Sequence, residues 1–204
     1  QAYQASQGDT DSSQTHSLDA AQDKKSFILE KQKNPSPTQT LRRDRDGFAI
    51  VTLPQGSTLI IQEDPSVEAF SIRALQHGGL RYETDATNGI YSLGSELLTK
   101  GTSQFDAPAL AYKMESMASS IQGMSGRNTL GLAGTGLSRY LDQTLELFVQ
   151  CLCDFSISEE EFLREQRLHL QYIKTQQEQL GAVNAEAFAQ QFFAGHPYAR
   201  PLHG

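Results

Sequence analysis

The chain of 204 residues is long enough to bury one core of ordinary size, and 38% of its residues are hydrophobic. Its formal net charge of −7 argues against nucleic acid and anionic membrane surfaces as partners, and no run of 18 apolar residues predicts a membrane-spanning helix. The chain begins with Gln and its start does not have the basic-then-apolar pattern of a signal peptide, so we expect a processed product or a fragment.

Residues 1–46 differ in composition from the rest of the chain. They are rich in Gln, Ser, Asp and Thr, with one apolar cluster at 27–29 followed by a proline-containing stretch and a charged run. Such a composition is typical of a linker or tail, and it leaves room for a short helix over 24–33. We therefore predict a boundary after residue 46 and a folded domain over 47–204.

The folded part is predicted to begin with three strands. Apolar runs with β-branched residues favour strands over 48–53, 57–63 and 67–76. Pro54-Gln55-Gly56 is a turn signal, so we expect the first two strands to pair as a hairpin. In the third strand, the residues that share one face by the two-residue period are Phe70, Ile72 and Ala74.

Five helices and one antiparallel strand pair are expected in the rest of the chain. The helices are predicted over 88–99, 107–119, 138–153, 158–178 and 182–194, and the strands over 121–125 and 129–136. Ser138 is the expected N-cap of the third helix. The apolar stripe of that helix is predicted to consist of Leu137, Leu141, Leu145, Phe148 and Leu152. This order of elements predicts an α+β fold in which helices cover a mostly antiparallel sheet.

Cys151 and Cys153 are the two cysteines of the chain, and both fall in the third helix. Residues two apart on a helix point to different faces, so the pair is badly placed for a mutual disulfide. The two cysteines also form no zinc motif with the five histidines. We expect both to act as small buried hydrophobic residues, which leaves the redox compartment open.

The segment 88–102 carries the most specific pattern of the chain, and it reads N-G-I-Y-S-L-G-S-E-L-L-T-K-G-T. It resembles the inverted zinc motif of pitrilysin/insulinase-type metallopeptidases, n-G-x-x-H-x-x-E-H-x-x-x-x-G-T. In that family the two His bind zinc from one helical face, and the Glu between them is the general base. The glycines and the Gly-Thr ending fit, but Ser92, Ser95 and Glu96 stand at the His, Glu and His positions.

The remaining zinc ligand of the family is a Glu about 75 residues after the motif, on a later helix. The segment 164–173 is similar to that helix, and Tyr172 stands at the ligand position. A catalytic zinc needs about three nitrogen, sulfur or carboxylate ligands from the protein. Since at most one of the four inherited positions offers such a ligand, we predict no catalytic residue, no metal and no cofactor in this segment.

Four shorter stretches support the same resemblance. They are L-P-Q-G at 53–56, G-G-L-R-Y-E at 78–83, G-R-N at 126–128 and H-P-Y-A-R-P-L-H-G at 196–204. The resemblance implies one unit of a two-halved, clam-shell peptidase, truncated before its companion domain. It is closest to the second repeat of a large two-repeat bacterial member, so the catalytic zinc is expected in the first repeat, outside this chain.

The function implied by the resemblance is that of a catalytically inert repeat, which forms part of the wall of a substrate chamber and aids peptide binding and closure. Its expected partners are peptide substrates and the catalytic half, in the same polypeptide or a partner subunit. The alternative is a structural scaffold subunit without peptidase function, and a third interpretation is a hydrolase with a rebuilt site. The fragment could form a homodimer, and the sequence does not choose between a bacterial periplasm and cytoplasm.

Several residues invite a chemical role, and each has a structural interpretation that we favour. His77 is expected to be a polar residue at the end of a strand and not a ligand. Glu96 is expected to bond to Tyr172 or to be solvated, although Glu96, His169 and Tyr172 could together form an adventitious metal site. Ser92 and Ser95 are expected to lie on the helix surface or to fill a cavity, because no serine-hydrolase pattern accompanies them.

Two further stretches are interpreted as structural. The glycine-rich stretch 131–136 lacks the Lys and the spacing of a phosphate loop, so we expect a strand that packs closely against a neighbour. The sequence His196-Pro197-Tyr198 is expected to lock the loop that follows the last helix.

Overall fold

The computed structural model describes residues 41–43, 48–53 and 55–204, and it divides the chain into two units, 1–64 and 65–204. The helix expected over 24–33 lies outside the described residues. The predicted boundary after residue 46 stays a prediction. Within the described residues, none of the helices combines the length and apolar character that a membrane span requires.

The first unit contains a small antiparallel sheet with the strand order β1-β2-β3. Its strands are β1 (Leu41–Arg43), β2 (Ala49–Thr52) and β3 (Thr58–Ile61). The predicted hairpin is present, because Ala49 lies opposite Ile61 and Thr52 lies opposite Thr58. Gly56 adopts a φ of 86° in the connecting turn, a conformation that glycine reaches without steric cost. Strand β1 was not predicted, since two of its three residues, Arg42 and Arg43, fall in the charged run.

The second unit is built on a three-stranded antiparallel sheet with the order β4-β6-β5. Its strands are β4 (Ala69–His77), β5 (Ser120–Ser125) and β6 (Thr129–Leu137). Strand β6 lies in the centre and pairs with β4 along its whole length, from Ala69 opposite Leu137 to His77 opposite Thr129. A Cβ atom added at Gly131 of β6 would lie 1.9 Å from the carbonyl oxygen of Ala74, so the close packing expected of this glycine-rich strand is confirmed.

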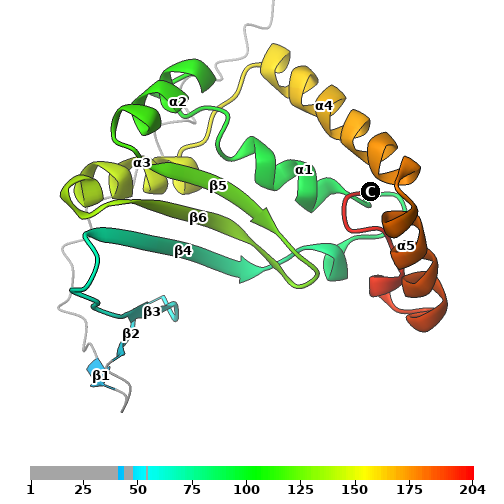
Figure 1. Ribbon diagram of the computed structural model, residues 1–204, viewed down its shortest axis with the longest axis horizontal. Coiled ribbons are helices and arrows are strands. Elements are labelled where there is room, and N and C mark those ends of the chain that lie inside the picture. The colour runs from blue at the N-terminus through cyan, green and yellow to red at the C-terminus, as the bar shows by residue number, and fades with distance from the viewer. Residues whose placement is uncertain (1–40, 44–47, 54) are drawn as a thin grey trace, which may run out of the picture. The chain divides into compact units, whose positions relative to one another are not determined.

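Five α-helices accompany this sheet (Figure 1). They are α1 (Ile90–Leu97), α2 (Ala107–Ser116), α3 (Leu141–Cys153), α4 (Glu159–Glu178) and α5 (Leu180–Phe192), with short 3-10 turns η2 (Leu80–Tyr82), η3 (Ser138–Tyr140) and η4 (Pro197–Ala199). The main core lies between the sheet, α2 and α3 and consists of Leu110, Met117, Ile121, Leu132, Leu147, Phe148 and Cys151. The α+β fold predicted from the sequence is therefore confirmed.

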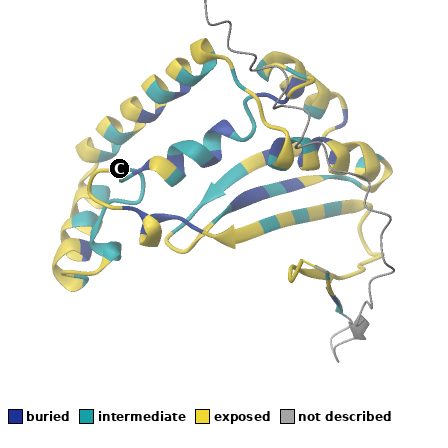
Figure 2. Ribbon diagram, turned by 180° about the vertical axis from the view of Figure 1, so that it is seen from behind, coloured by how far each residue is buried: buried dark blue, intermediate teal, exposed yellow. Residues whose placement is uncertain are grey.

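Helix α3 differs from the prediction in its start and in the face that it buries. Ser138 opens the turn η3 instead of capping the helix, which begins after Tyr140. The buried face consists of Thr144, Leu147, Phe148 and Cys151, whereas Leu141 and Leu145 of the predicted stripe remain exposed. Figure 2 shows that the helices of the molecule carry both buried and exposed residues. Apolar residues lie on more than one side of this helix, so the helical period of the sequence fits two possible buried faces. Packing against β6 determines which of the two faces is buried.

The two cysteines have different environments because α3 turns them to different sides. Cys151 is fully buried in the core, and burial raises the pKa of its thiol to about 11. Cys153 is exposed, so the prediction that both cysteines are buried is wrong for this residue. Both are free thiols.

Candidate functional site

Helix α1 carries Ser92, Ser95 and Glu96, and its start is fixed by a buried glutamate. The main-chain N–H groups of Gly89 and Tyr91 each donate a 2.9 Å hydrogen bond to the carboxylate of Glu83. The side chain of Asn88 donates a third, also at 2.9 Å. The carboxylate therefore satisfies N–H groups that have no partner inside the helix, and its negative charge suits the positive end of the helix dipole.

The middle of α1 rests directly on the sheet. A Cβ atom added at Gly123 of β5 would lie 1.8 Å from the carbonyl oxygen of Ser95, which no side chain other than hydrogen allows. The glycine therefore lets the backbone of the helix approach the backbone of the strand. This contact sets the height of the motif residues above the sheet.

Both serines of the motif are buried and hydrogen-bonded. Ser92 Oγ lies 2.8 Å from Nδ1 of His203, and Ser95 Oγ donates to the carbonyl oxygen of Ser92 at 2.8 Å. Burial and then the neighbouring charge of His169 lower the pKa of His203, against the attraction of Glu96. No carboxylate among the described residues accepts a hydrogen bond from His203, and Ser92 is only 3% exposed, so this pair does not form a serine nucleophile.

Glu96 pairs with His169 of α4. Nδ1 of His169 lies 3.1 and 3.3 Å from the two carboxylate oxygens, and Nε2 lies 2.9 Å from the carbonyl oxygen of His203. Because a carbonyl oxygen only accepts, Nε2 carries a proton, and the contact with Glu96 becomes an ion pair when Nδ1 is protonated as well. Of the two expectations for Glu96, the bond to Tyr172 is not formed, whereas a solvated side chain fits its 43% exposure.

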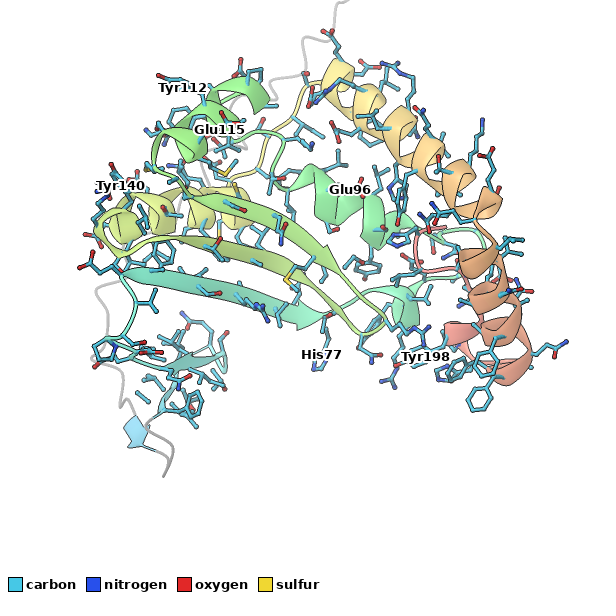
Figure 3. The ribbon with its side chains drawn as sticks, viewed as in Figure 1. His77, Glu96, Tyr112, Glu115, Tyr140 and Tyr198 are labelled. Atoms are coloured by element: carbon cyan, nitrogen blue, oxygen red, sulfur yellow. The ribbon has the colours of Figure 1, made fainter. Side chains whose placement is uncertain are left out.

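The Tyr172 ring instead packs edge-on against the ring of His203, with the ring centres 5.1 Å apart. His203 thus contacts Ser92 of α1 as well as Tyr172 of α4. The segment that contains His203 therefore contacts both of the helices that carry the four motif positions. Figure 3 shows Glu96 on α1, on the side of the molecule where α4 runs.

The donor set at the four motif positions does not fit a zinc ion. A hydroxyl and a phenol replace two of the three expected ligands, a second hydroxyl replaces the general base, and both ring nitrogens of His169 are already engaged with oxygen atoms. In the part of the chain that the structure describes, no group of three or more His, Cys, Asp or Glu side chains is placed to hold a metal ion. The assignment of Ser92, Ser95, Glu96 and Tyr172 as degenerate motif positions stays a prediction.

The other highlighted residues have structural surroundings. His77 is exposed at the end of β4, far from Glu96 (Figure 3). Tyr198 donates a 2.6 Å hydrogen bond from its hydroxyl to Oδ1 of Asn128, and His196 accepts the main-chain N–H of Tyr198 at 3.2 Å. The stretch 196–198 thus fastens the end of the chain to the turn between β5 and β6, as expected for a loop lock.

Sequence reasoning missed the roles of Glu83 and His203. Both fall in stretches noted only as points of resemblance, 78–83 and 196–204. An acid shortly before a helix is a recognisable signal for an interaction with its N-terminus, and it was available for Glu83. Nothing local identifies His203, because its partner Ser92 is 111 residues away along the chain.

Comparison with known proteins identifies a matching family and several similar proteins. A family model described as "Insulinase (Peptidase family M16)" matches residues 58–204. An uncharacterized zinc protease of Rickettsia bellii is 23% identical over 160 residues, covering 78% of this chain and 39% of the relative. Mouse mitochondrial cytochrome b-c1 complex subunit 1 is 24% identical over 192 residues, covering 83% of this chain and 40% of the relative.

A solved structure shows the same fold. The peptidase M16 inactive domain from Pseudomonas fluorescens superposes with a TM-score of 0.70 at 18% identity, over 77% of this chain and 38% of the other. The chain therefore spans about two fifths of the length of the proteins that it matches.

Proposed function

Because the chain belongs to the insulinase family, peptidase family M16, we propose that it is a catalytically inert repeat of a zinc-dependent peptidase. In this proposal the repeat forms part of the wall of a substrate chamber and helps to bind peptides and to close the chamber. The catalytic zinc lies in another part of the same polypeptide or in a partner subunit. Peptides could add a strand to an exposed edge of the sheet, since β4 and β5 are both edge strands.

One observation supports the proposal: the two helices that carry the four motif positions are held against each other, while the side chains at those positions do not form a zinc site. Glu83 fixes the start of α1, Gly123 supports its middle, and Lys100, just beyond its end, pairs with the buried Glu165 of α4 at 3.1 Å. The helix bearing Ser92, Ser95 and Glu96 therefore faces the helix bearing Tyr172. Two hydroxyls, a phenol and a carboxylate that is already paired with His169 do not make up a zinc site, and the general-base position holds Ser95 instead of a carboxylate.

The names of the similar proteins support an inert unit within a larger peptidase. The Rickettsia bellii relative is named a zinc protease, and the Pseudomonas fluorescens structure is named an inactive domain. Each is about two and a half times as long as the matched region, which leaves room for a second, catalytic repeat.

The decisive experiment measures zinc by elemental analysis of the purified chain, together with hydrolysis of a quenched-fluorescent peptide. We expect less than stoichiometric zinc and no cleavage above the rate of the buffer. One tightly bound zinc per chain with chelator-sensitive cleavage would mean that the site has been rebuilt, and the proposal would be wrong.

A structural scaffold is the second candidate, and the similarity to a cytochrome b-c1 complex subunit favours it. The two candidates differ in what the rest of the polypeptide contains. An intact H-x-x-E-H motif with a distal Glu elsewhere in the full-length protein, and peptide hydrolysis that is lost when that motif is mutated, would support the peptidase. A full-length protein without the motif and without hydrolysis would support the scaffold.

A further inference from the structure

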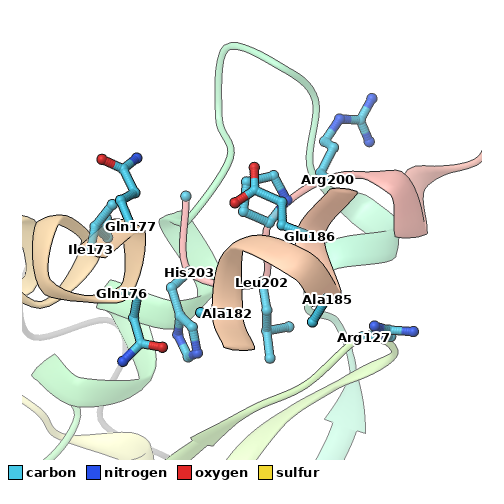
Figure 4. A pocket seen from close by; sticks show the side chains of 12 residues that line it. Arg127, Ile173, Gln176, Gln177, Ala182, Ala185, Glu186, Arg200, Leu202 and His203 are labelled. Atoms are coloured by element: carbon cyan, nitrogen blue, oxygen red, sulfur yellow. The ribbon is translucent and has the colours of Figure 1, made fainter. Parts of the chain in front are cut away.

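A cavity of about 240 Å³ lies where α4 meets α5, beside the segment 200–204 and the turn between β5 and β6 (Figure 4). Apolar side chains contribute much of its wall: Ile173 of α4, Ala182 and Ala185 of α5, and Pro201 and Leu202. The two alanines keep the space open, because a larger side chain at either position would extend into it. The volume is below the roughly 300–1,000 Å³ typical of sites for drug-sized ligands, so the cavity suits a single residue.

Arg127 supplies a positive charge at the wall of this cavity. Its guanidinium carbon lies 5.6 Å from the ring centre of Phe193 and 5.4 Å from that of Tyr198, and the Tyr198 hydroxyl is itself held by Asn128. A guanidinium stacked on rings keeps its in-plane N–H donors available for a carboxylate. Among residues 41–43, 48–53 and 55–204, no Asp or Glu pairs with Arg127.

Arg127 is the charged side chain of the wall that is best suited to bind a carboxylate. Arg200 is engaged, because its Nε donates to Asp85 at 2.6 Å and its Nη1 donates to the carbonyl oxygen of Glu83 at 3.0 Å. Glu186 is negative and accepts a hydrogen bond from Gln190 at 3.1 Å. Figure 4 shows Glu186 on a different side of the cavity from Arg127, so a negative ligand group is favoured at Arg127 and disfavoured at Glu186.

We propose that this cavity binds the carboxy-terminal residue of a peptide that ends in an apolar side chain. The side chain lies among Ile173, Ala182 and Leu202, and the free carboxylate accepts hydrogen bonds from Arg127. The proposal concerns binding alone and does not depend on where the catalytic zinc lies.

The test is calorimetric titration of the chain with three small probes. N-acetylleucine carries both the side chain and the carboxylate, N-acetylleucinamide lacks the charge, and N-acetylglycine lacks the side chain. We expect saturable binding of N-acetylleucine and binding of the other two that is weaker by about tenfold or more, since a charged hydrogen bond or a buried side chain is lost. Equal binding of the acid and the amide, or no saturable binding of N-acetylleucine, would overturn the proposal.

Three variants locate the site. Arg127→Gln removes the charge, and Ala185→Leu fills the space, and each is expected to weaken N-acetylleucine binding by about tenfold. Arg139→Gln is the matched control, because Arg139 also stacks on a ring, that of Tyr140 at 4.9 Å, but does not line the cavity. Circular dichroism melting checks that all three variants fold. Equal weakening by Arg127→Gln and Arg139→Gln would show that the cavity is not the binding site.

Discussion

At the scale of single residues, His169 joins three parts of the chain that are far apart in sequence. Its ring lies between the carboxylate of Glu96 on α1 and the carbonyl oxygen of His203, and the residue is only 6% exposed. A buried polar group with partners on both sides is costly to disturb, because a substitution leaves those partners without hydrogen bonds.

Replacing His169 by Leu is expected to lower the free energy of unfolding by about 1–3 kcal/mol, since the partly buried carbonyl oxygen of His203 loses its hydrogen-bond donor. Glu96→Gln is the control. The Glu96 side chain is 43% exposed, and glutamine can still bond to His169, so a loss below about 1 kcal/mol is expected. Urea unfolding followed by circular dichroism measures both. Equal losses would mean that the carbonyl contact of His169 contributes little.

The protonation of His203 predicts a pH dependence of stability. Burial and the charge of His169 hold the pKa of His203 below the usual 6.5 in the folded protein. The unfolded chain therefore binds the proton more tightly, and stability decreases as the pH falls through 6.5 until the lowered folded pKa is passed. Above the unfolded pKa this contribution is fully retained.

His203→Asn isolates that contribution, because asparagine does not titrate and can still bond to Ser92. The free energy of unfolding of both proteins is measured in urea between about pH 7.5 and about pH 5. We expect the wild-type chain to lose more stability than the variant over this range. Parallel pH profiles would show that His203 has the same pKa in the folded and unfolded states.

At the scale of elements, α1 is held at its start and in its middle through its backbone. Glu83 bonds to main-chain N–H groups at its start, and Gly123 of β5 meets the main chain of Ser95. The helix has only eight residues, which is too short to be stable by itself, so these tertiary contacts determine that it forms.

Gly123→Ala is expected to lower the free energy of unfolding by about 1–3 kcal/mol, because the new methyl group overlaps the Ser95 carbonyl and pushes α1 away from the sheet. Gly94→Ala in α1 is the matched control. A Cβ at Gly94 meets no atom within 4 Å, and alanine favours the helix, so stability should stay unchanged or rise by up to about 1 kcal/mol. Thermal melts of both variants test the pair, and a neutral Gly123→Ala would contradict the close contact.

The sequence predicted the elements better than their contacts. The turn residues at 54–56 and 126–128 are local signals, so the hairpin and the strand pair were predicted correctly. The buried face of α3 was wrong in part, because two apolar faces fit one helical period. The bonds from His169 to Glu96 and from His203 to Ser92 join residues 73 and 111 positions apart, and no local pattern encodes such pairs.

At the scale of the whole molecule, the chain is one part of a longer architecture in its relatives, of which it spans about two fifths. If chamber closure by an opposing half is needed for peptide hydrolysis, restoring the motif in this chain alone does not restore an enzyme. The proposed function therefore predicts that restoring the motif residues in this chain can add a bound zinc ion without adding peptidase activity.

The restored variant combines Ser92→His, Ser95→Glu, Glu96→His and Tyr172→Glu. We expect no hydrolysis of a quenched-fluorescent peptide by this isolated variant, and the unmodified chain serves as the control. Zinc content is measured on the same sample, because bound zinc without hydrolysis separates a formed metal site from a working enzyme. Chelator-sensitive cleavage would show that the opposing half is not required.

One contact that holds α1 does not depend on the identity of a motif side chain. The strand meets the carbonyl group of Ser95, and that group is the same whichever side chain the residue carries. A substitution at position 95 therefore leaves this contact in place, whatever it does to the chemistry of the motif. A change at Gly123, in contrast, is removed quickly because it damages folding. Mutational decay in such a unit therefore erases the chemistry long before it erases the architecture.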